Sequence, residues 1–427
     1  MKKFEYPRLG ESIYKTVLSN GLTVEIVPRP GFTKKLAYFV TDFGSIHTDF
    51  ELDGQEYHVP AGVAHFLEHK MFDMPDGRDV TAELAALGAG VNAFTSFDIT
   101  AYVIACTEKF DECLKILLEF VSTPCFTEES VQKEMGIIDQ EIGMYLDSPD
   151  SRVFEDVMAC LCRSHPIRVP ILGTSETIRQ ITPEILHTCH RAFYTPGNMV
   201  LCVVGDVDPD RVAAIAEEVL GTEQRSVGKK LRDWQEDMTV AAPFSSRNME
   251  VSMPTFQLGF KCEDAGWGRE SVRKEIVGDL AAEALFGESS ELYLKLYEDG
   301  LIDSSFGGGF ETSEGVSMLF CGGDSDEPEA VRDAILAEAA RLAQTGVDEA
   351  DFLRMKRSAM GRRIRNLDSF DNTCFRVCAH HLSKFEYFDF PGVYEEVTAE
   401  ELREFLARVI VPERMSLSVI WPKEEEA

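Results

Sequence analysis

The sequence predicts an α+β protein made of two homologous domains, each a mainly antiparallel sheet with helices packed on one face. An internal repeat is the first observation: residues 182–204 recur without a gap as residues 398–420, at an offset of 216 in a chain of 427. A looser echo relates 126–131 to 347–352. Such matches at about half the chain length indicate two copies of one fold. Short gaps between strand-like segments, together with long helices, favour α+β over a doubly wound parallel sheet.

Hydrophobic patterning predicts the elements of the first half in chain order. Asn20-Gly21 is a turn signal, and the alternating segment 22–27 after it is typical of a strand. Apolar runs predict further strands at 34–43 and 99–107. Apolar residues at helical spacing predict helices near 58–72, 79–88, 109–121, 127–147 and 151–162.

The same patterns continue in the second half, after a polar and irregular stretch. The predicted helices lie near 269–286, 328–345, 348–367 and 396–410, and the predicted strands near 254–262, 315–321 and 414–420. Gly221, Gly228 and Pro243 in the intervening stretch are typical of a linker. We therefore expect an N-terminal domain at 1–225, a linker at 226–245 and a C-terminal domain at 246–427.

Charge and composition exclude several classes of function. The chain has 74 Asp and Glu against 42 Lys and Arg, a net charge of −32, which repels phosphate backbones and anionic lipids. We expect no nucleic-acid partner and no membrane partner, and no apolar run reaches the ~18 residues that would span a bilayer. The charge can also serve solubility alone. The first seven residues lack a secretory signal, and the 11 cysteines are scattered through strand and helix patterns, so the sequence favours a reduced, cytoplasmic protein.

A short motif at 61–72 has the spacing of a metal site. His65 and His69 are one helical turn apart and project from the same face, with Glu68 beside them. Two such imidazoles can hold one cation while the glutamate reaches a water molecule beside it. The order H-x-x-E-H is a signature of zinc peptidases. The alternative is a helix that carries these three residues on a solvated side.

A catalytic zinc site with two histidines usually takes a carboxylate as its third protein ligand. The predicted helix 127–147 carries Glu134 and Glu141 two turns apart, on one face, beside an apolar stripe that includes Ile138. Burial of that stripe can turn Glu141 toward the histidines. Without the histidine motif, both carboxylates would be assigned to the wet side of an amphipathic helix.

With these motifs in place, the chain resembles the pitrilysin/insulinase family of inverted-motif zinc metallopeptidases. The likeness covers essentially the whole chain and points to the short-subunit branch, with mitochondrial processing peptidase and bacterial paired subunits. It implies a half-clamshell fold, one Zn²⁺ per chain held by His65, His69 and Glu141, and a supporting role for Glu134. It also implies that Glu68 is the catalytic base and acid.

The same resemblance assigns a substrate-binding role to the segment after residue 90. Asn92, Ala93, Phe94 and Thr95 match an edge strand that binds an extended peptide by strand addition in the family. The segment can equally be one more hairpin strand.

One departure from the family pattern concerns its second half. The Arg and Tyr that hold substrate in active single-type subunits are replaced here by Tyr297 and Asp303. No second H-x-x-E-H occurs, and the offset of 221 maps Glu141 onto Arg362. We expect this chain to be the metal-bearing subunit of a dimer with a homologous, zinc-less partner, or else a homodimer.

The expected function is zinc-dependent hydrolysis of short or unfolded peptides by an endopeptidase. Two other readings stay open: a non-catalytic scaffold, and a dedicated processing or export factor for one modified peptide. Two further clusters, Cys374–His381 and Cys189-His190, are interpreted as packing, with core-facing thiols and, in the first cluster, exposed histidines.

Overall fold

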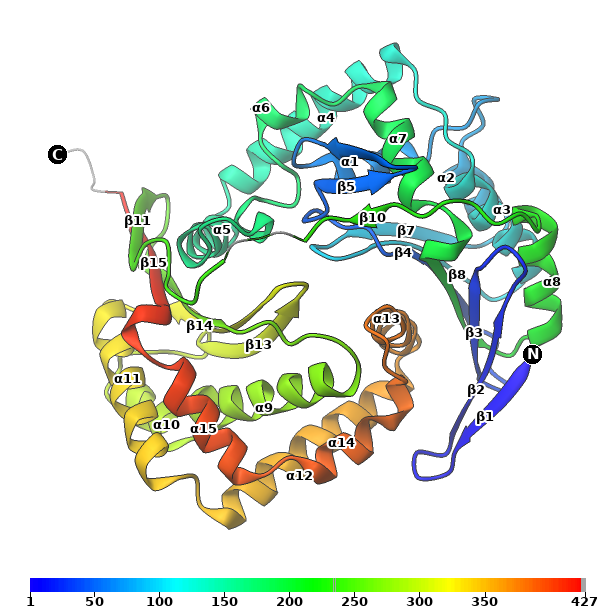
Figure 1. Cartoon of the computed structure of the whole chain (residues 1–427). Helices are drawn as coiled ribbons and strands as arrows, with labels where there is room; N and C mark the ends of the chain where they lie inside the picture. The colour runs from blue at the N-terminus through cyan, green and yellow to red at the C-terminus, as the bar shows by residue number, and fades with distance from the viewer. Residues whose placement is uncertain (233, 235, 424–427) are drawn as a thin grey trace. The chain divides into compact units, whose positions relative to one another are not determined.

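The computed structural model describes residues 1–232, 234 and 236–423, and these form two compact units (Figure 1). Unit 1 comprises residues 1–142, 170–232 and 364–389. Unit 2 comprises the described residues of 143–169, 233–363 and 390–427. Each unit combines one main sheet with long helices, which confirms the predicted α+β class with two related parts.

Unit 1 is built on a seven-stranded sheet in the order β1-β2-β3-β9-β4-β8-β7. Its strands are β1 (Lys2–Tyr6), β2 (Glu11–Val17), β3 (Thr23–Pro28), β4 (Lys35–Thr41), β7 (Gly90–Thr95), β8 (Thr100–Cys106) and β9 (Met199–Gly205). All neighbours pair antiparallel except β3 and β9, which run parallel. The strands predicted at 22–27, 34–43 and 99–107 are confirmed as β3, β4 and β8. A smaller sheet joins β10 (Lys229–Lys230), β5 (Asp49–Leu52) and β6 (Gln55–His58).

The helices predicted for the first half are all present. They are α1 (Val63–Lys70), α2 (Val80–Ala86), α3 (Phe110–Ser122), α4 (Glu128–Leu146) and α5 (Pro149–Leu161). The sequence patterns missed α6 (Ser175–Ile178) and α8 (Pro209–Leu220), while α7 (Pro183–Phe193) belongs to the repeat. Helix α1 is shorter than the predicted 58–72 because Gly62, with φ of 93°, ends the preceding loop in the left-handed region.

Unit 2 repeats the central part of this topology. Its sheet has the order β11-β15-β12-β14-β13, and only β11 and β15 run parallel. The strands are β11 (Phe244–Met249), β12 (Thr255–Cys262), β13 (Gly307–Ser313), β14 (Val316–Asp324) and β15 (Met415–Pro422). The second-half helices are α9 (Gly268–Phe286), α10 (Glu291–Glu298), α11 (Pro328–Thr345), α12 (Glu349–Arg365), α13 (Phe370–Leu382), α14 (Phe390–Glu396) and α15 (Ala399–Val409).

The repeat detected in the sequence is also a repeat of secondary-structure elements. Thr182 and Thr398 cap α7 and α15, and each side chain accepts a hydrogen bond from the backbone N–H three residues on. Each helix is followed by a short 3₁₀ turn and then by the central strand, β9 or β15. The offset of 216 therefore relates β9 to β15 residue by residue.

One helix from each half belongs to the other unit. Helix α5 packs on β12 and β15 within unit 2, where the Phe154 and Phe320 rings lie 5.8 Å apart. Helix α13 packs on β4 and β9 within unit 1, where the Cys374 thiol contacts the Cys202 carbonyl at 3.8 Å. Each sheet thus carries helices of its own half on one face, as predicted, and one further helix on the other. The continuous domain boundaries at 1–225, 226–245 and 246–427 stay a prediction.

The cysteine-rich segment of α13 is a packing element. Cys374 and Cys378 are fully buried, and all 11 cysteines, each within the described residues, are free thiols. His380 is not exposed as expected: it is buried and stacks on Tyr387 with ring centroids 5.1 Å apart. The side of α13 that carries His380 is therefore packed against apolar residues, as is the side that carries the thiols.

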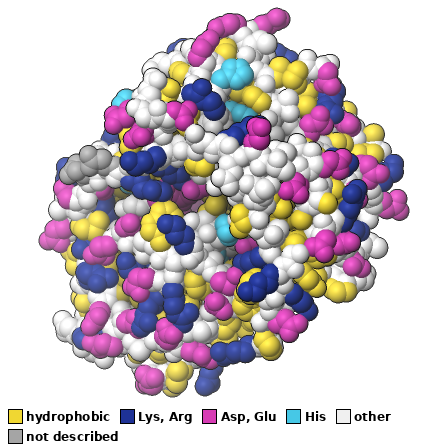
Figure 2. All heavy atoms as spheres, turned by 45° about the vertical axis from the view of Figure 1, so that its right-hand side comes forward, with side chains coloured by type: hydrophobic (Ala, Val, Ile, Leu, Met, Phe, Trp, Pro, Cys, Tyr) yellow, Lys and Arg dark blue, Asp and Glu magenta, His cyan; other side chains and the backbone are white. Residues whose placement is uncertain are grey.

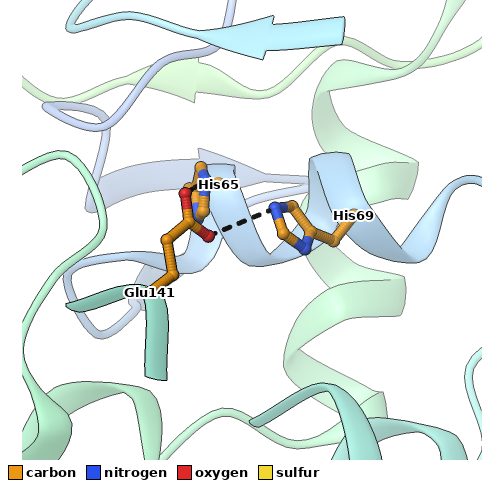
Figure 3. Close-up of side chains that lie close together, drawn as sticks. All are labelled: His65, His69 and Glu141. Atoms are coloured by element: carbon orange, nitrogen blue, oxygen red, sulfur yellow. Dashed lines mark ion pairs between the residues drawn. The ribbon is translucent and has the colours of Figure 1, made fainter. Parts of the chain in front are cut away.

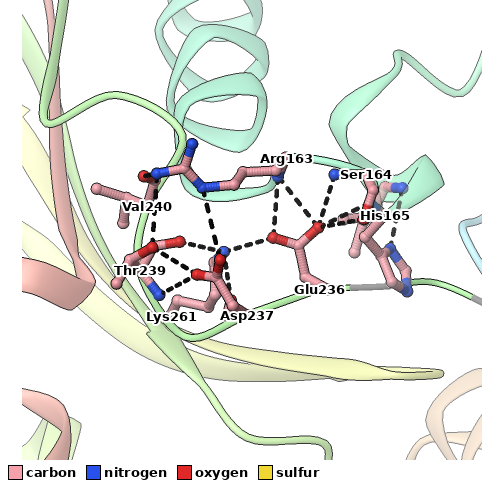
Figure 4. A network of polar contacts seen from close by, with 9 residues as sticks. Arg163, Ser164, His165, Glu236, Asp237, Thr239, Val240 and Lys261 are labelled. Atoms are coloured by element: carbon pink, nitrogen blue, oxygen red, sulfur yellow. Dashed lines mark hydrogen bonds and ion pairs between the residues drawn. The ribbon is translucent and has the colours of Figure 1, made fainter.

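The segment that begins at Glu236 is bound to the rest of unit 2 by hydrogen bonds and an ion pair (Figure 4). The Glu236 carboxylate accepts hydrogen bonds from the backbone N–H groups of Arg163, Ser164 and His165, at 2.7–3.1 Å. It also pairs with the Lys261 ammonium at 2.6 Å, and that side chain is fully buried. A buried charge pair is tolerated only when its remaining polar atoms are satisfied, and here they are.

Figure 2 shows one face of the chain, on which acidic side chains are spread rather than gathered into one patch. Lys and Arg side chains lie between them on the same face. Among the described residues, no helix is both long enough and apolar enough to cross a bilayer.

Candidate metal centre

Helix α1 presents the histidine motif from a fixed position in the core. Phe66 and Leu67 are fully buried, which sets the rotation of the helix about its axis. A Cβ atom at Gly62, just before the helix, would lie 2.4 Å from the Leu172 carbonyl oxygen, so only glycine fits at this close approach. His65 and Glu68 are buried on the remaining side, 7% and 8% exposed.

Helix α4 brings the third group to the histidines, as the sequence predicts (Figure 3). Burial of Ile138 turns one face of α4 inward. The two oxygens of Glu141 then lie 3.8 Å from His65 Nε2 and 3.7 Å from His69 Nε2. One ligand atom from each of the three residues lies within 4.8 Å of the others, the single such group found among the described residues.

These separations fit a shared cation better than direct hydrogen bonds. A nitrogen and an oxygen 3.7–3.8 Å apart are too distant to bond each other. Ligand atoms around a tetrahedral zinc, at ~2.0–2.2 Å from the ion, are themselves roughly 3.4 Å apart. Two imidazoles and one carboxylate are also the donor set of a catalytic zinc site. The residues present therefore fit a zinc ion.

The pKa values of the two histidines are shifted in opposite directions. Burial, assisted by the neighbouring His69, lowers the pKa of His65 to about 3, so its imidazole stays neutral, the form that binds a metal. His69 Nδ1 lies 2.9 Å from Glu134 Oε1. Burial lowers the pKa of His69, but the hydrogen bond and charge of Glu134 outweigh it, and the net pKa is raised. The same hydrogen bond lowers the pKa of Glu134 and leaves His69 Nε2 directed at Glu141.

Glu68 has a partner that the sequence analysis did not predict. The Thr95 hydroxyl donates a hydrogen bond of 2.6 Å to Glu68 Oε2. Burial raises the pKa of Glu68, and this hydrogen bond offsets the rise only in part. Thr95 was identified only through the resemblance, as part of a substrate-binding strand. No pattern in the sequence indicates this contact, because it depends on where strand β7 meets α1 in the folded chain.

The strand that carries Thr95 lies at the edge of the sheet. Within the part of the chain that the structure describes, strand β7 pairs with β8 alone, so the backbone groups of its other side face away from the sheet. Asn92 is exposed, whereas Ala93 and Phe94 are partly buried. The Phe94 ring lies 6.1 Å from that of Phe375 on α13. Strand β7 is thus both an edge strand next to the histidine helix and one strand of a hairpin with β8, and its substrate-binding role stays a prediction.

The second unit carries different chemistry at the matching positions. Arg362, at the position that the offset relates to Glu141, forms an ion pair of 2.9 Å with Glu283 on α9. Tyr297 is 54% exposed on α10, and the Asp303 carboxylate accepts a hydrogen bond from the Ser305 backbone N–H. An arginine side chain thus occupies the sequence position in the second half that corresponds to the Glu141 carboxylate in the first.

Comparison with known proteins gives a consistent result. Residues 54–175 match the family model described as insulinase (peptidase family M16), and residues 180–359 match the one described as the peptidase M16 inactive domain. The chain is 36% identical to the uncharacterized zinc protease YmfH of Bacillus subtilis, over 99% of this chain and 100% of the relative. It is 26% identical to the mitochondrial-processing peptidase subunit beta of Caenorhabditis elegans, over 96% and 91% of the two chains.

A solved structure extends this likeness to the fold. The M16-like peptidase from Alicyclobacillus acidocaldarius superposes with a TM-score of 0.93 at 33% identity, covering 98% of this chain and 100% of that one. Both units are therefore matched along nearly their whole length.

Proposed function

Because the chain belongs to the M16 (insulinase) family of peptidases, we propose that it is a zinc-dependent endopeptidase that hydrolyses short or unfolded peptides. We propose further that it is the metal-bearing subunit of a dimer. The observation that carries the proposal is the convergence of His65, His69 and Glu141 within 4.8 Å, with Glu68 on the same helix. A scaffold that had lost activity would have no need to keep these four groups together.

The proposed roles follow from the contacts of each side chain. His65, His69 and Glu141 hold the ion, and Glu134 orients His69 through its Nδ1 hydrogen. Zinc, when bound there, would polarise the scissile carbonyl and acidify a water molecule. Glu68 accepts the proton of that water and delivers it to the leaving amine, and its raised pKa suits a group that must both accept and give up a proton.

The edge strand supports the proposed substrate class. A peptide can add to the free edge of β7 by backbone hydrogen bonds, which make small demands on its sequence but require it to be extended. Asn92, Ala93, Phe94 and Thr95 would line this contact. Most segments of a folded protein are already paired or packed and are not available to add as a strand, so we propose short or unfolded peptides as substrates.

The second half supports a partner. Where the family pattern has Arg and Tyr, this chain has Tyr297 and Asp303, and the related C. elegans protein is named as a subunit. We propose that a homologous zinc-less chain supplies the missing pair, with a homodimer as the alternative. The 11 free thiols are compatible with a reducing compartment, and we place the protein in the cytoplasm.

The test combines metal analysis with one conservative variant. We expect one zinc ion per chain in both the wild type and Glu68→Gln, and hydrolysis of an internally quenched unstructured peptide by the wild type only. A loss of roughly 10²-fold or more is expected, because general acid–base catalysis contributes about 10²–10⁴-fold. Hydrolysis retained by Glu68→Gln would contradict the assignment of the base.

The partner is tested with the same peptide. We expect the purified chain to hydrolyse it slowly, and addition of a homologous chain that lacks the histidine motif to raise the rate. Full hydrolysis by the purified chain alone would exclude the heterodimer.

A further inference from the structure

A row of three threonines crosses the sheet of unit 1 beneath the helices. Thr41 on β4 pairs with Thr100 on β8, which pairs with Thr95 on β7. Directly paired residues project from the same face of a sheet, so the three hydroxyls lie in line. Thr41 and Thr100 are fully buried. The row ends at the Glu68 carboxylate, to which Thr95 Oγ1 donates at 2.6 Å.

The proton of each hydroxyl has a defined acceptor. Thr41 Oγ1 donates to the Phe193 carbonyl at 2.7 Å, and Thr100 Oγ1 donates to the Phe43 carbonyl at 2.9 Å. A hydroxyl has one proton to donate, so Thr100 gives none to Thr95, although their oxygens lie 3.4 Å apart. Thr95 in turn gives its proton to Glu68 Oε2.

Unit 2 provides an internal comparison, because its sheet has the same pairing. Met199 on β9 and Met415 on β15 are equivalent positions of the repeat. Met199 pairs with Thr41, and Met415 pairs with Phe260, so Phe260 is the counterpart of Thr41. The next two positions across the sheet follow from the same register. The row that reads Thr41, Thr100, Thr95 in unit 1 reads Phe260, Leu319, Phe310 in unit 2.

The helix residue that faces this row also differs between the two units. In unit 2, Phe310 faces Gly278 on α9, and a Cβ atom at Gly278 would lie 2.2 Å from Phe310 Cγ. Gly278 therefore stands opposite Phe310 as Glu68 stands opposite Thr95. In unit 1 the Thr95 hydroxyl meets the Glu68 carboxylate, whereas in unit 2 the Phe310 ring lies against a glycine. The threonine at this position thus goes with the carboxylate and is not a general requirement of the fold.

We propose that Thr95 is a positioning residue for Glu68, an inference that rests on the proposed function. Its hydroxyl fixes Glu68 Oε2 and leaves Oε1 to receive a proton from the attacking water. A free carboxylate on a helix samples several rotamers, and a displacement of about 1 Å of a reacting group can cost ~10²-fold in rate. Because Thr95 also ends the edge strand, the base and the proposed peptide-binding edge are held by one residue.

The experiment compares three single variants of the full chain with zinc bound, and with the partner chain if hydrolysis requires it. Thr95→Val keeps the shape and the backbone but removes the donor, and Thr95→Ser restores the donor. Thr41→Val is the matched control, because it removes a hydroxyl from the same row on β4, two strands away from Thr95. The probe is the internally quenched unstructured peptide, with kcat and KM measured separately and zinc content determined for each protein.

We expect Thr95→Val to lower kcat by about 10- to 100-fold, with KM within about twofold and zinc content unchanged. Thr95→Ser should recover kcat to within about threefold of the wild type, and Thr41→Val should leave it unchanged. An unchanged kcat in Thr95→Val, an equal loss in Thr95→Ser, or a change in KM alone would each overturn the inference.

A second measurement needs neither metal nor substrate. In the metal-free chain, Thr95→Val should shift the urea midpoint in the wild-type background and shift it less in the Glu68→Ala background, because its partner is then absent. Equal shifts in both backgrounds would overturn the contact. If Glu68→Gln still hydrolyses the peptide, the proposed function is overturned. If Glu68→Gln is inactive but Thr95→Val has the wild-type rate, only this inference is overturned.

Discussion

Replacement of Glu236 by Gln should destabilise unit 2 strongly at neutral pH and progressively less in acid. The carboxylate of Glu236 is 5% exposed and binds a fully buried Lys261 together with three backbone N–H groups (Figure 4). A glutamine would leave the Lys261 ammonium without its anionic partner. It would also turn an N–H₂ group toward backbone donors that need an acceptor.

The magnitude follows from the pKa of the carboxyl. Burial alone would raise it, but Lys261 and the backbone N–H groups outweigh burial and lower the pKa of Glu236 from 4.5 to about 2. At 1.36 kcal/mol for each pKa unit, this difference corresponds to about 3 kcal/mol of stability. Removal of one partner of a buried ion pair costs about 3–5 kcal/mol, a consistent range.

The sign of the pH dependence is fixed by the direction of the shift. A carboxyl whose pKa is depressed on folding stabilises the protein fully above its unfolded value, here 4.5, and this contribution is lost as pH falls toward 2. At pH 3.5 the linkage relation removes about 1.4 kcal/mol of it. The stability difference between the wild type and Glu236→Gln should therefore shrink by that amount between pH 7 and pH 3.5.

Urea unfolding followed by tryptophan fluorescence measures this difference. The three tryptophans, Trp234, Trp267 and Trp421, all lie in unit 2, so their fluorescence reports that unit alone. The matched control is Asp237→Asn, at an exposed neighbour of the same segment, which should leave the midpoint nearly unchanged. A Glu236→Gln difference that is the same at both pH values, or no larger than that of Asp237→Asn, would refute the reasoning.

Three further predictions concern the metal centre and the thiols. Glu134→Gln should weaken zinc binding by about 10- to 100-fold, measured by competition with a chelator, because His69 loses its charged hydrogen-bond partner; equal affinities would remove Glu134 from this role. Chelation of zinc should lower the melting temperature of the wild type, and added zinc should restore it, because the ion binds only the folded site; a melting temperature that does not respond would argue against a bound ion. In the native chain, a thiol reagent should modify only the two half-buried cysteines, Cys125 and Cys160, quickly, and all 11 after urea is added; rapid native reaction of more than two would contradict the burial described here.

His65 and His69 were predictable as a pair because their relation is local, whereas Glu141, 72 residues further along the chain, was matched to them through the family resemblance. His65 and His69 are one turn apart on one helix, and Glu141 lies on a helix whose apolar stripe shows which side is buried. Helical periodicity alone places such groups on a face. The Thr95–Glu68 contact was not predictable, because it depends on the distance at which a sheet edge meets a helix.

For the fold, too, features set by neighbouring residues were predictable, whereas features set by contacts between distant segments were not. The repeat at an offset of 216 predicted a duplicated sheet, since capping threonines and central strands recur at fixed spacing. Polar strands such as β11 and the β1–β2 hairpin lack an apolar pattern and were missed. The amphipathic pattern of α13 shows that it has a buried face but not which sheet covers that face. The burial of His380 follows from this packing and could not be read from the sequence.

The exchange of α5 and α13 between the two halves has a consequence for biosynthesis. During translation, β4 and β9 emerge long before Phe370–Leu382, so the face of the first sheet that carries Cys202 has no cover until most of the polypeptide has left the ribosome. N-terminal domains ordinarily fold first as they emerge. This chain cannot complete its first half in that order, and a gene fragment that ends before α13 would encode a protein with an uncovered apolar surface, prone to aggregate.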